Sequence, residues 1–188
     1  TSATNRIRSY DIESGKIIWE ATGMTRNVIP MPVLKDNIVY LSSGFRGTAL
    51  LAIDLLKAKG NIDNSDAVVW KYTKNTPYTP SPLLMGDLLY FLRGNNGRLS
   101  CLNAIDGSEN YTIESLEGIS DLFTSPIGVQ DRLYILGRDG LTYVIKHGTK
   151  FEVLAKNQLN DNFIASPAII GDTIYLRGYN NLYSIKQK

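Results

Sequence analysis

The chain has few of the side chains on which most active sites are built. It contains one cysteine, Cys101, and one histidine, His147. A single cysteine excludes a disulfide within the chain and a zinc site made of several cysteines. One histidine without partners supports neither a metal cluster nor a catalytic triad. We therefore expect Cys101 to be a buried free thiol, His147 to be an exposed turn residue, and no residue to be catalytic.

Clustered charge and long apolar runs are also lacking. The net charge is +2, and the lysines and arginines are scattered, so we expect no nucleic-acid partner. No apolar run approaches the roughly 18 residues of a membrane-spanning helix, and no segment has sustained helical periodicity. Neither a starting methionine nor a signal peptide is present. We therefore expect a mature chain or a piece of one.

What the sequence does contain is a repeat. Three similar segments, 81–90, 125–134 and 166–175, begin with Ser-Pro and end in tyrosine, and 31–40 is a looser fourth copy. In all four the tyrosine follows the proline by eight places, and the prolines are 50, 44 and 41 residues apart. A period of roughly 40–45 residues made of short strands is typical of β-propeller blades. We expect the repeated serines to satisfy backbone groups where each inner strand starts.

The repeat predicts an all-β propeller of four-stranded antiparallel blades. The single domain, or C-terminal part of one, spans residues 1–188, with about four blades. We place an outer half-blade at 6–20, blades at about 28–72, 79–113 and 123–154, and an incomplete last blade at 164–186. Residues 55–66 form an insertion that should protrude from its blade. An open arc leaves hydrophobic sheet faces exposed, which favours part of a larger ring or self-association that completes one.

A second pattern alternates with the first. Ser9-x-Asp11-x-x-Ser14-Gly15-x-x-x-Trp19 and Cys101-x-Asn103-x-x-Asp106-Gly107-x-x-x-Tyr111 share their spacing, and Ala52-x-Asp54 with Trp70 is the same pattern split by the insertion. It resembles the tryptophan-docking motif, A-x-D-x-x-T-G-x-x-x-W, of the pyrroloquinoline-quinone-like (PQQ-like) β-propeller repeats. We predict that Trp19 and Trp70 are buried between adjacent blades, with Tyr111 at the matching position. The third full blade departs from the motif at Lys146-His147-Gly148.

The resemblance implies a ring of seven or eight blades and two functional classes. Quinoprotein dehydrogenases bind PQQ and calcium and carry a neighbouring cysteine pair, which one cysteine cannot supply. The other class contains non-catalytic binding propellers, such as the outer-membrane assembly lipoprotein. We expect this second class: a non-enzymatic scaffold outside the cytoplasm, periplasmic or secreted, without a cofactor of its own. The alternatives are part of a PQQ- and calcium-dependent dehydrogenase and a sensor domain of a signalling protein. The polar loop 63–66 lacks EF-hand spacing, so we expect a solvated loop there and no metal.

An arginine recurs in each turn between the second and third strands of a blade: Arg46, Arg93, Arg138 and Arg177. In a propeller these turns share a face with the loops that contain Arg26, Tyr78, Asp121 and Asp161. We predict that the four turn arginines and Asn96 form a binding face, opposite the Ser14-Gly15 turn, for a protein or a small anionic ligand. Guanidinium groups suit this role because they recognise carboxylate and phosphate. The alternative is that each arginine pairs with an acid of the adjacent blade, for instance Asp121, Asp139 or Asp161.

Overall fold

The described part of the chain, residues 1–186, consists of short strands and turns in a computed structural model. The first blade contains β1 (Ser2–Ala3), β2 (Arg6–Tyr10), β3 (Ile17–Thr22) and β7 (Gly60–Asn61). The second contains β4 (Val33–Lys35), β5 (Ile38–Ser43), β6 (Ala49–Asp54) and β8 (Val68–Tyr72). The third contains β9 (Leu83–Met85), β10 (Leu88–Leu92), β11 (Arg98–Asn103) and β12 (Glu109–Ser115). The fourth contains β13 (Ile127–Val129), β14 (Arg132–Leu136), β15 (Leu141–Lys146) and β16 (Val153–Gln158). The fifth contains β17 (Ala168–Ile170), β18 (Thr173–Arg177) and β19 (Leu182–Lys186).

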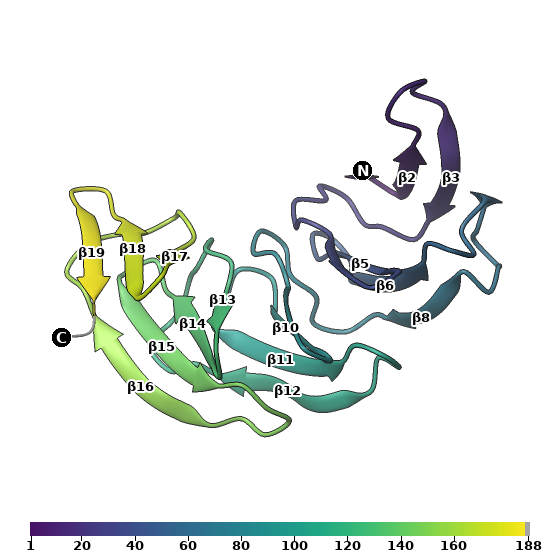
Figure 1. The fold of residues 1–188 in the computed structure, drawn as a ribbon. Helices are drawn as coiled ribbons and strands as arrows, with labels where there is room; N and C mark the ends of the chain where they lie inside the picture. Colours follow the sequence, from purple (N-terminus) through teal and green to yellow (C-terminus); the bar gives the residue numbers. More distant parts are fainter. Residues whose placement is uncertain (187–188) are drawn as a thin grey trace.

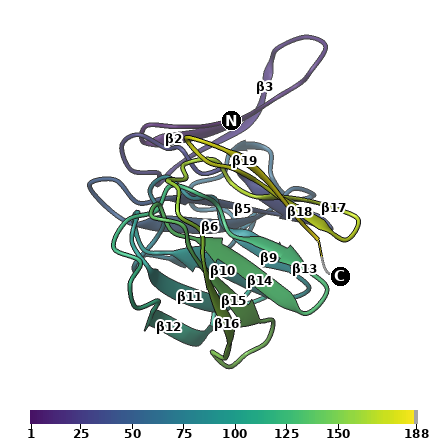
Figure 2. The same cartoon turned by 90° about the vertical axis from the view of Figure 1, so that its left-hand side faces the viewer.

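These sheets are the blades of a partial β-propeller, as the repeat predicts. Figure 1 shows them following one another in an open arc, with β8, β12 and β16 on its outer side. The short first strands lie side by side, since β9 contacts both β4 and β13. Within residues 1–186 the first and fifth blades share no sheet. In Figure 2, which turns the C-terminal side toward the viewer, the hairpin of β2 and β3 extends beyond the other blades.

The Ser-Pro repeats connect neighbouring blades through their backbone. The hydroxyl of Ser81 accepts a hydrogen bond from the Met31 amide at 2.9 Å, and that of Ser125 accepts one from the Ser81 amide at 3.0 Å. Ser166 continues the series by accepting from the Ser125 amide at 2.8 Å. Each serine thus satisfies the equivalent backbone donor of the preceding blade, which explains why the repeat places a hydroxyl there.

The aromatic residues of the second pattern lie between blades. Trp19 is 5% exposed and packs with Leu51 and Ile53 of the second blade. Trp70 is only partly buried, which corrects the expectation of a largely buried indole. Its Nε1–H donates to the Ala104 carbonyl at 3.0 Å, and its ring lies over Gly107 of the third blade. The indole therefore docks on the turn of the next blade.

The other residues of that pattern shape the turns. The Asp11 carboxylate accepts hydrogen bonds from the Ser14 amide and hydroxyl at 2.8 and 2.6 Å, and Gly15 adopts a φ of 69°. Tyr111 is 9% exposed and packs edge-on against Phe151 of the fourth blade, with 5.8 Å between ring centroids. Its hydroxyl is buried without a partner among residues 1–186, and this burial raises its pKa above the usual value.

The insertion was expected to protrude from its blade, but it packs against the neighbouring blade instead. Its strand β7 pairs in parallel with β3 of the first blade, so the second blade supplies an outer strand to its neighbour. Ile62 is fully buried beside Trp19, and the Asp63 carboxylate accepts from the Thr22 amide and hydroxyl at 2.5 and 3.0 Å. Ile62 and Asp63 therefore connect the first two blades, and we call this connection the clasp. Residues 63–66 are only in part the solvated loop that was expected. Burial of Ile62 stabilises this arrangement.

Candidate binding face

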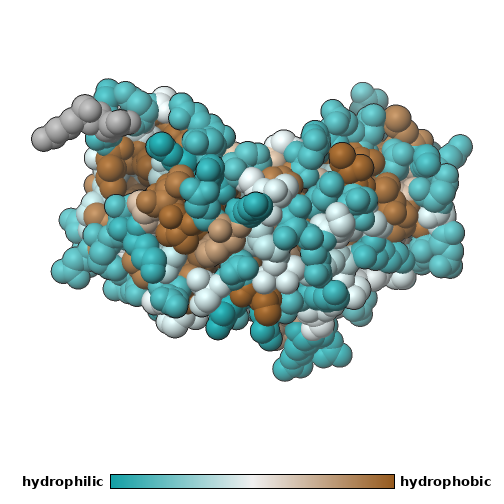
Figure 3. Space-filling view, turned by 90° about the horizontal axis from the view of Figure 1, so that it is seen from below, coloured by the Kyte–Doolittle hydropathy of each residue, from teal (hydrophilic) through white to brown (hydrophobic). Residues whose placement is uncertain are grey.

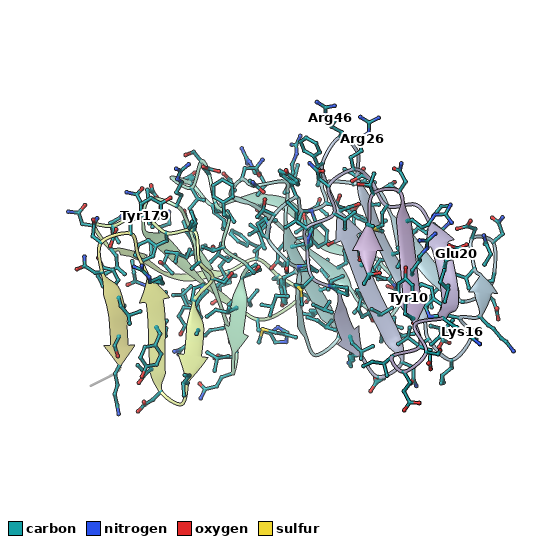
Figure 4. The ribbon with its side chains drawn as sticks, turned by 90° about the horizontal axis from the view of Figure 1, so that it is seen from above. Tyr10, Lys16, Glu20, Arg26, Arg46 and Tyr179 are labelled. Atoms are coloured by element: carbon teal, nitrogen blue, oxygen red, sulfur yellow. The ribbon has the colours of Figure 1, made fainter. Side chains whose placement is uncertain are left out.

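The turns between second and third strands share a face with the loops before each blade. Isolated bridges join Arg26 to Phe45, Pro77 to Gly94, and Phe163 to Gly178. In Figure 4 the side chains of Arg26, Arg46 and Tyr179 project from one edge of the molecule, and Lys16 lies toward the opposite edge. The predicted grouping of these loops, away from the Ser14-Gly15 side, is therefore present in the fold.

Arg26 and Arg46 form the most prominent feature of this face. Their side chains extend away from the sheets next to one another (Figure 4), and neither forms an ion pair within residues 1–186. The Arg46 guanidinium lies 5.4 Å from the centre of the Phe45 ring. Phe45 in turn stacks on Tyr78 with 4.8 Å between ring centroids. We call Arg26, Phe45, Arg46 and Tyr78 the arginine tip.

The backbone of the arginine tip is held in an uncommon conformation. Arg46 has a φ of 53° and Asn27, next to Arg26, has a φ of 50°. Residues other than glycine occupy this left-handed region at a cost of about 1–2 kcal/mol each. Within residues 1–186, five other non-glycine residues adopt the same region, so this conformation is not confined to the arginine tip.

Arg138 lies in a second, smaller cluster. Its guanidinium forms an ion pair with Asp121 at 3.1 Å and lies 5.8 Å from the Phe123 ring centre. The hydrogen bond to that carboxylate raises the pKa of Arg138. Phe123, Arg138 and Tyr179 also line a shallow hollow of about 410 Å³. Arg138 thus pairs with Asp121, one of the acids named in the alternative expectation, although Asp121 lies in the loop that leads into the same blade and not in an adjacent blade.

The remaining predicted residues differ in their contacts. Arg93 is exposed, and Arg177 donates to the carbonyl of its neighbour Gly178 at 2.6 Å. Asn96 buries its side-chain oxygen without a partner among the described residues. Asp161 accepts hydrogen bonds from the backbone amides of Asn180 and Asn181 and so holds the turn of the fifth blade. Of the four turn arginines, only Arg138 forms an ion pair within residues 1–186.

The single cysteine and the single histidine lie in the interior between blades. Cys101 is fully buried, and burial raises the pKa of its thiol to about 11. His147 is partly buried rather than exposed, with Nδ1 2.8 Å from the Tyr90 hydroxyl. Tyr90 also accepts from the Gly148 amide at 2.9 Å. The shortened turn of the fourth blade is thus tied to the third blade by hydrogen bonds instead of a docked tryptophan.

Two further properties bear on function. Within residues 1–186, no three histidine, cysteine, aspartate or glutamate side chains are grouped so that they could hold a metal ion. The same residues include no helix with the length and apolar character needed to cross a membrane.

Comparison with known proteins identifies the family. The family described as "Outer membrane protein assembly factor BamB", a group of PQQ-like repeats, matches residues 1–188. The chain belongs to this family. No curated protein sequence matches the chain.

Solved structures show the same fold at low sequence identity. BamB from Moraxella catarrhalis is 13% identical, with a TM-score of 0.51 over 98% of this chain and 67% of that one. The computationally designed Ika8 protein is 10% identical, with a TM-score of 0.70 over 95% of this chain and 52% of that one. A europium-containing methanol dehydrogenase is 13% identical, with a TM-score of 0.53 over 82% of this chain and 27% of that one. The chain thus spans about two thirds of that BamB chain.

Proposed function

We propose that this protein is a non-enzymatic binding propeller outside the cytoplasm that holds a protein partner against its loop face. Membership of the BamB family supports a scaffold role and an extracytoplasmic location. The fold suits that role, because blades built from local repeats present variable loops on a rigid support.

The arginine tip is the observation that carries the proposal. Two guanidinium groups, which have no acidic partner among the residues that the structure describes, stand beside a stacked pair of aromatic rings. Arginine and aromatic side chains provide most of the binding energy in many protein interfaces. A carboxylate between Arg26 and Arg46 would replace water on both groups and form charge-assisted hydrogen bonds. The favoured partner is therefore a protein with an acidic surface segment.

Photo-crosslinking in cells that express the protein tests this proposal. Replacing Phe45 with p-benzoylphenylalanine keeps an aromatic ring in the arginine tip, and the same replacement of exposed Tyr10 is the control. We expect Phe45, and not Tyr10, to yield a defined crosslinked protein. The charge reversals Arg26→Glu and Arg46→Glu together should abolish that product.

Reversal of Lys16 and Lys59 serves as the matched control, because these lysines are exposed and outside the arginine tip. It should leave the crosslink unchanged. Equal crosslinking from Phe45 and Tyr10, or a product that survives reversal of both arginines, would contradict the proposal.

A further inference from the structure

The loop face has a second feature beside the arginine tip. A shallow hollow of about 410 Å³ lies between loops of the third, fourth and fifth blades. We call it the loop hollow, and it is lined by Thr79, Phe123, Arg138, Ile164 and Tyr179. Figure 3, drawn from the side opposite to Figure 4, shows hydrophobic residues gathered toward both ends of the arc. The loop hollow is instead formed by the loops of successive blades, so it does not depend on an open strand edge.

The Ser-Pro repeat places three of the lining residues side by side. Thr79, Phe123 and Ile164 each stand two positions before a serine of the repeat. The amide of each of the first two of these serines donates a hydrogen bond to the hydroxyl of the next, at 3.0 and 2.8 Å. One series of hydrogen bonds between blades therefore sets the spacing of the three loops that form the hollow.

Further hydrogen bonds fix the loops around the hollow. The side-chain oxygen of Asn95 accepts from the Thr79 amide at 3.0 Å, and its carbonyl accepts from the Leu122 amide at 2.9 Å. The Phe163 amide donates to the Arg138 carbonyl at 2.8 Å. Each of these residues lines the hollow or is the chain neighbour of a residue that does, except Asn95, which joins two of the loops. A surface that is ordered before binding loses less conformational entropy when a ligand binds.

The loop hollow is continuous with the arginine tip. Tyr78 of the tip and Thr79 of the hollow are consecutive residues, so their Cα atoms are about 3.8 Å apart. In Figure 4 the side chains of Arg26, Arg46 and Tyr179 project from the same edge of the molecule. A segment that lies along this edge can therefore contact both features.

The two features differ in charge. The guanidinium groups of the arginine tip have no acidic partner among residues 1–186, whereas Arg138 is paired with Asp121 at 3.1 Å. The hollow therefore needs no charged ligand. Its walls include Ile164 and Tyr179, which are 51% and 56% exposed, and covering them removes apolar surface from water. The Arg138 guanidinium, 5.8 Å from the ring centre of Phe123, offers a plane on which an aromatic ring stacks.

We infer that the loop hollow binds a large aromatic side chain of the same partner segment whose carboxylates bind the arginine tip. The inference rests on the proposed function, because it takes the occupant to be part of the protein partner. Aromatic residues are the usual anchors of protein interfaces. The segment is therefore acidic and carries a tryptophan, tyrosine or phenylalanine within a few residues of its carboxylates.

A series of labelled peptides tests the inference. Each peptide contains two aspartates and one tryptophan, in either order, separated by a glycine-serine spacer of two, four or six residues. An extended chain spans about 3.3–3.6 Å per residue, so the series covers roughly 10–25 Å. We expect fluorescence anisotropy to show, for at least one peptide, binding to the native protein at least about tenfold tighter than that of its counterpart with alanine for tryptophan. Absence of this preference from the whole series overturns the inference.

Variants of the protein locate the aromatic residue. Tyr179→Ala combined with Ile164→Ser removes two exposed walls of the hollow and should abolish the preference for tryptophan. Tyr10→Ala combined with Ile12→Ser is the matched control, because both residues are exposed and neither lines the hollow. Ile164→Trp fills the hollow without removing a wall and should also abolish the preference. Circular dichroism verifies that the variants are folded, and a preference that survives in the folded hollow variants overturns the inference.

Reversal of both arginines separates this inference from the proposed function. Arg26→Glu with Arg46→Glu should weaken the tryptophan and alanine peptides by the same factor and leave the preference between them. If this reversal affects neither peptide, the proposed role of the arginine tip fails, while the preference of the hollow for an aromatic residue stands. If it weakens both and the hollow variants keep the preference, the inference fails and the proposed function stands.

Other occupants of the hollow give distinct results. If N-acetyltryptophanamide alone bound as tightly as the best peptide, the hollow would be a site for a small molecule. If a second copy of the chain occupied it, sedimentation would show a native dimer that Ile164→Trp converts to a monomer. Either result would overturn the inference.

Discussion

At the scale of single residues, the contact between Trp70 and Gly107 provides a sharp test of blade docking. A Cβ atom at Gly107 would lie 2.8 Å from Cδ2 of the indole, and this glycine has a φ of 74°. Gly15 has a similar φ of 69°, but no atom lies within 4 Å of an added Cβ. We expect Gly15→Ala to lower the free energy of unfolding by about 1–2 kcal/mol, from backbone strain alone. Gly107→Ala should cost about 1–3 kcal/mol more, because the added methyl group displaces the indole. Urea unfolding measures both, and equal losses would show that the indole is not anchored there.

Trp19 and Trp70 should differ in their contribution to stability. Trp19 is enclosed by the first two blades and the insertion, whereas Trp70 remains partly exposed. We expect Trp19→Ala to cost about 3–5 kcal/mol, the usual range for a large aromatic residue in a core. Trp70→Ala should lower the free energy of unfolding by less than Trp19→Ala does. Chemical denaturation of both variants in one buffer provides the comparison, and a larger loss for Trp70 would contradict this account.

The sequence predicts the residues that pack between blades well where a motif repeats. The spacing from glycine to aromatic residue predicted that Trp19, Trp70 and Tyr111 pack between blades, because docking requires one fixed geometry. It did not predict that Ala155, paired with Val144, takes the place of the aromatic residue in the fourth blade, because that blade lacks the motif from which a register could be read. Nor did it predict the bond between His147 and Tyr90, since partners 57 residues apart leave no local pattern.

At the scale of elements, the clasp formed by the insertion makes a pH-dependent prediction. The hydrogen bond from the Thr22 amide lowers the pKa of Asp63 below its ordinary value of 3.8. A carboxyl group with a depressed pKa stabilises the fold above its unfolded-state pKa, and this contribution is lost as the pH falls through the folded-state value. At pH 7 the Asp63→Ala variant should therefore have a lower melting temperature than the native protein. The difference should begin to shrink as the pH falls below about 3.8, where the unfolded chain binds a proton at Asp63, and should be smallest below the lower pKa of the folded-state carboxylate.

Asp66→Ala is the matched control, because Asp66 is in the same loop and its contact is an exposed ion pair with Lys57. Pairs of that kind contribute little, so its melting temperature should remain near that of the native protein. A difference for Asp63→Ala that persists unchanged at pH 3 would rule out the carboxylate as the cause.

The predicted elements were most accurate where each strand is followed by its neighbour in sequence. β5 and β6 of the second blade, for example, are joined by the short turn between Ser43 and Ala49. Outer strands are harder to predict: β16 (Val153–Gln158) is exposed along its whole length. Outer strands are half-exposed, so their hydrophobic pattern is weak. The pairing of β7 with β3 was missed because a two-residue parallel strand across blades carries no periodicity.

At the scale of the whole molecule, an open arc should not be uniformly stable. Repeat architectures are stabilised by each unit and by its contacts with nearest neighbours, so units with two neighbours are held more firmly. The third blade has a neighbour on each side, and Leu89 to Leu92 of β10 are all fully buried. The fifth blade has one, and Leu182 of β19 is 71% exposed.

Native-state hydrogen exchange can measure this gradient. We expect the amides of β10 and β11 to exchange most slowly, at rates set by global unfolding, and those of β19 to exchange fastest through local opening. The first blade should be intermediate, because the clasp formed by Ile62 and Asp63 supplies it with contacts that the fifth blade lacks. Ala155→Trp should slow exchange in β18 and β19 by improving the contact between the fourth and fifth blades, and leave β2 unchanged. Uniform protection from β2 to β19 would instead indicate that the ends are held together in solution, by ring closure or by a second copy, and the arc would not be the working form of the chain.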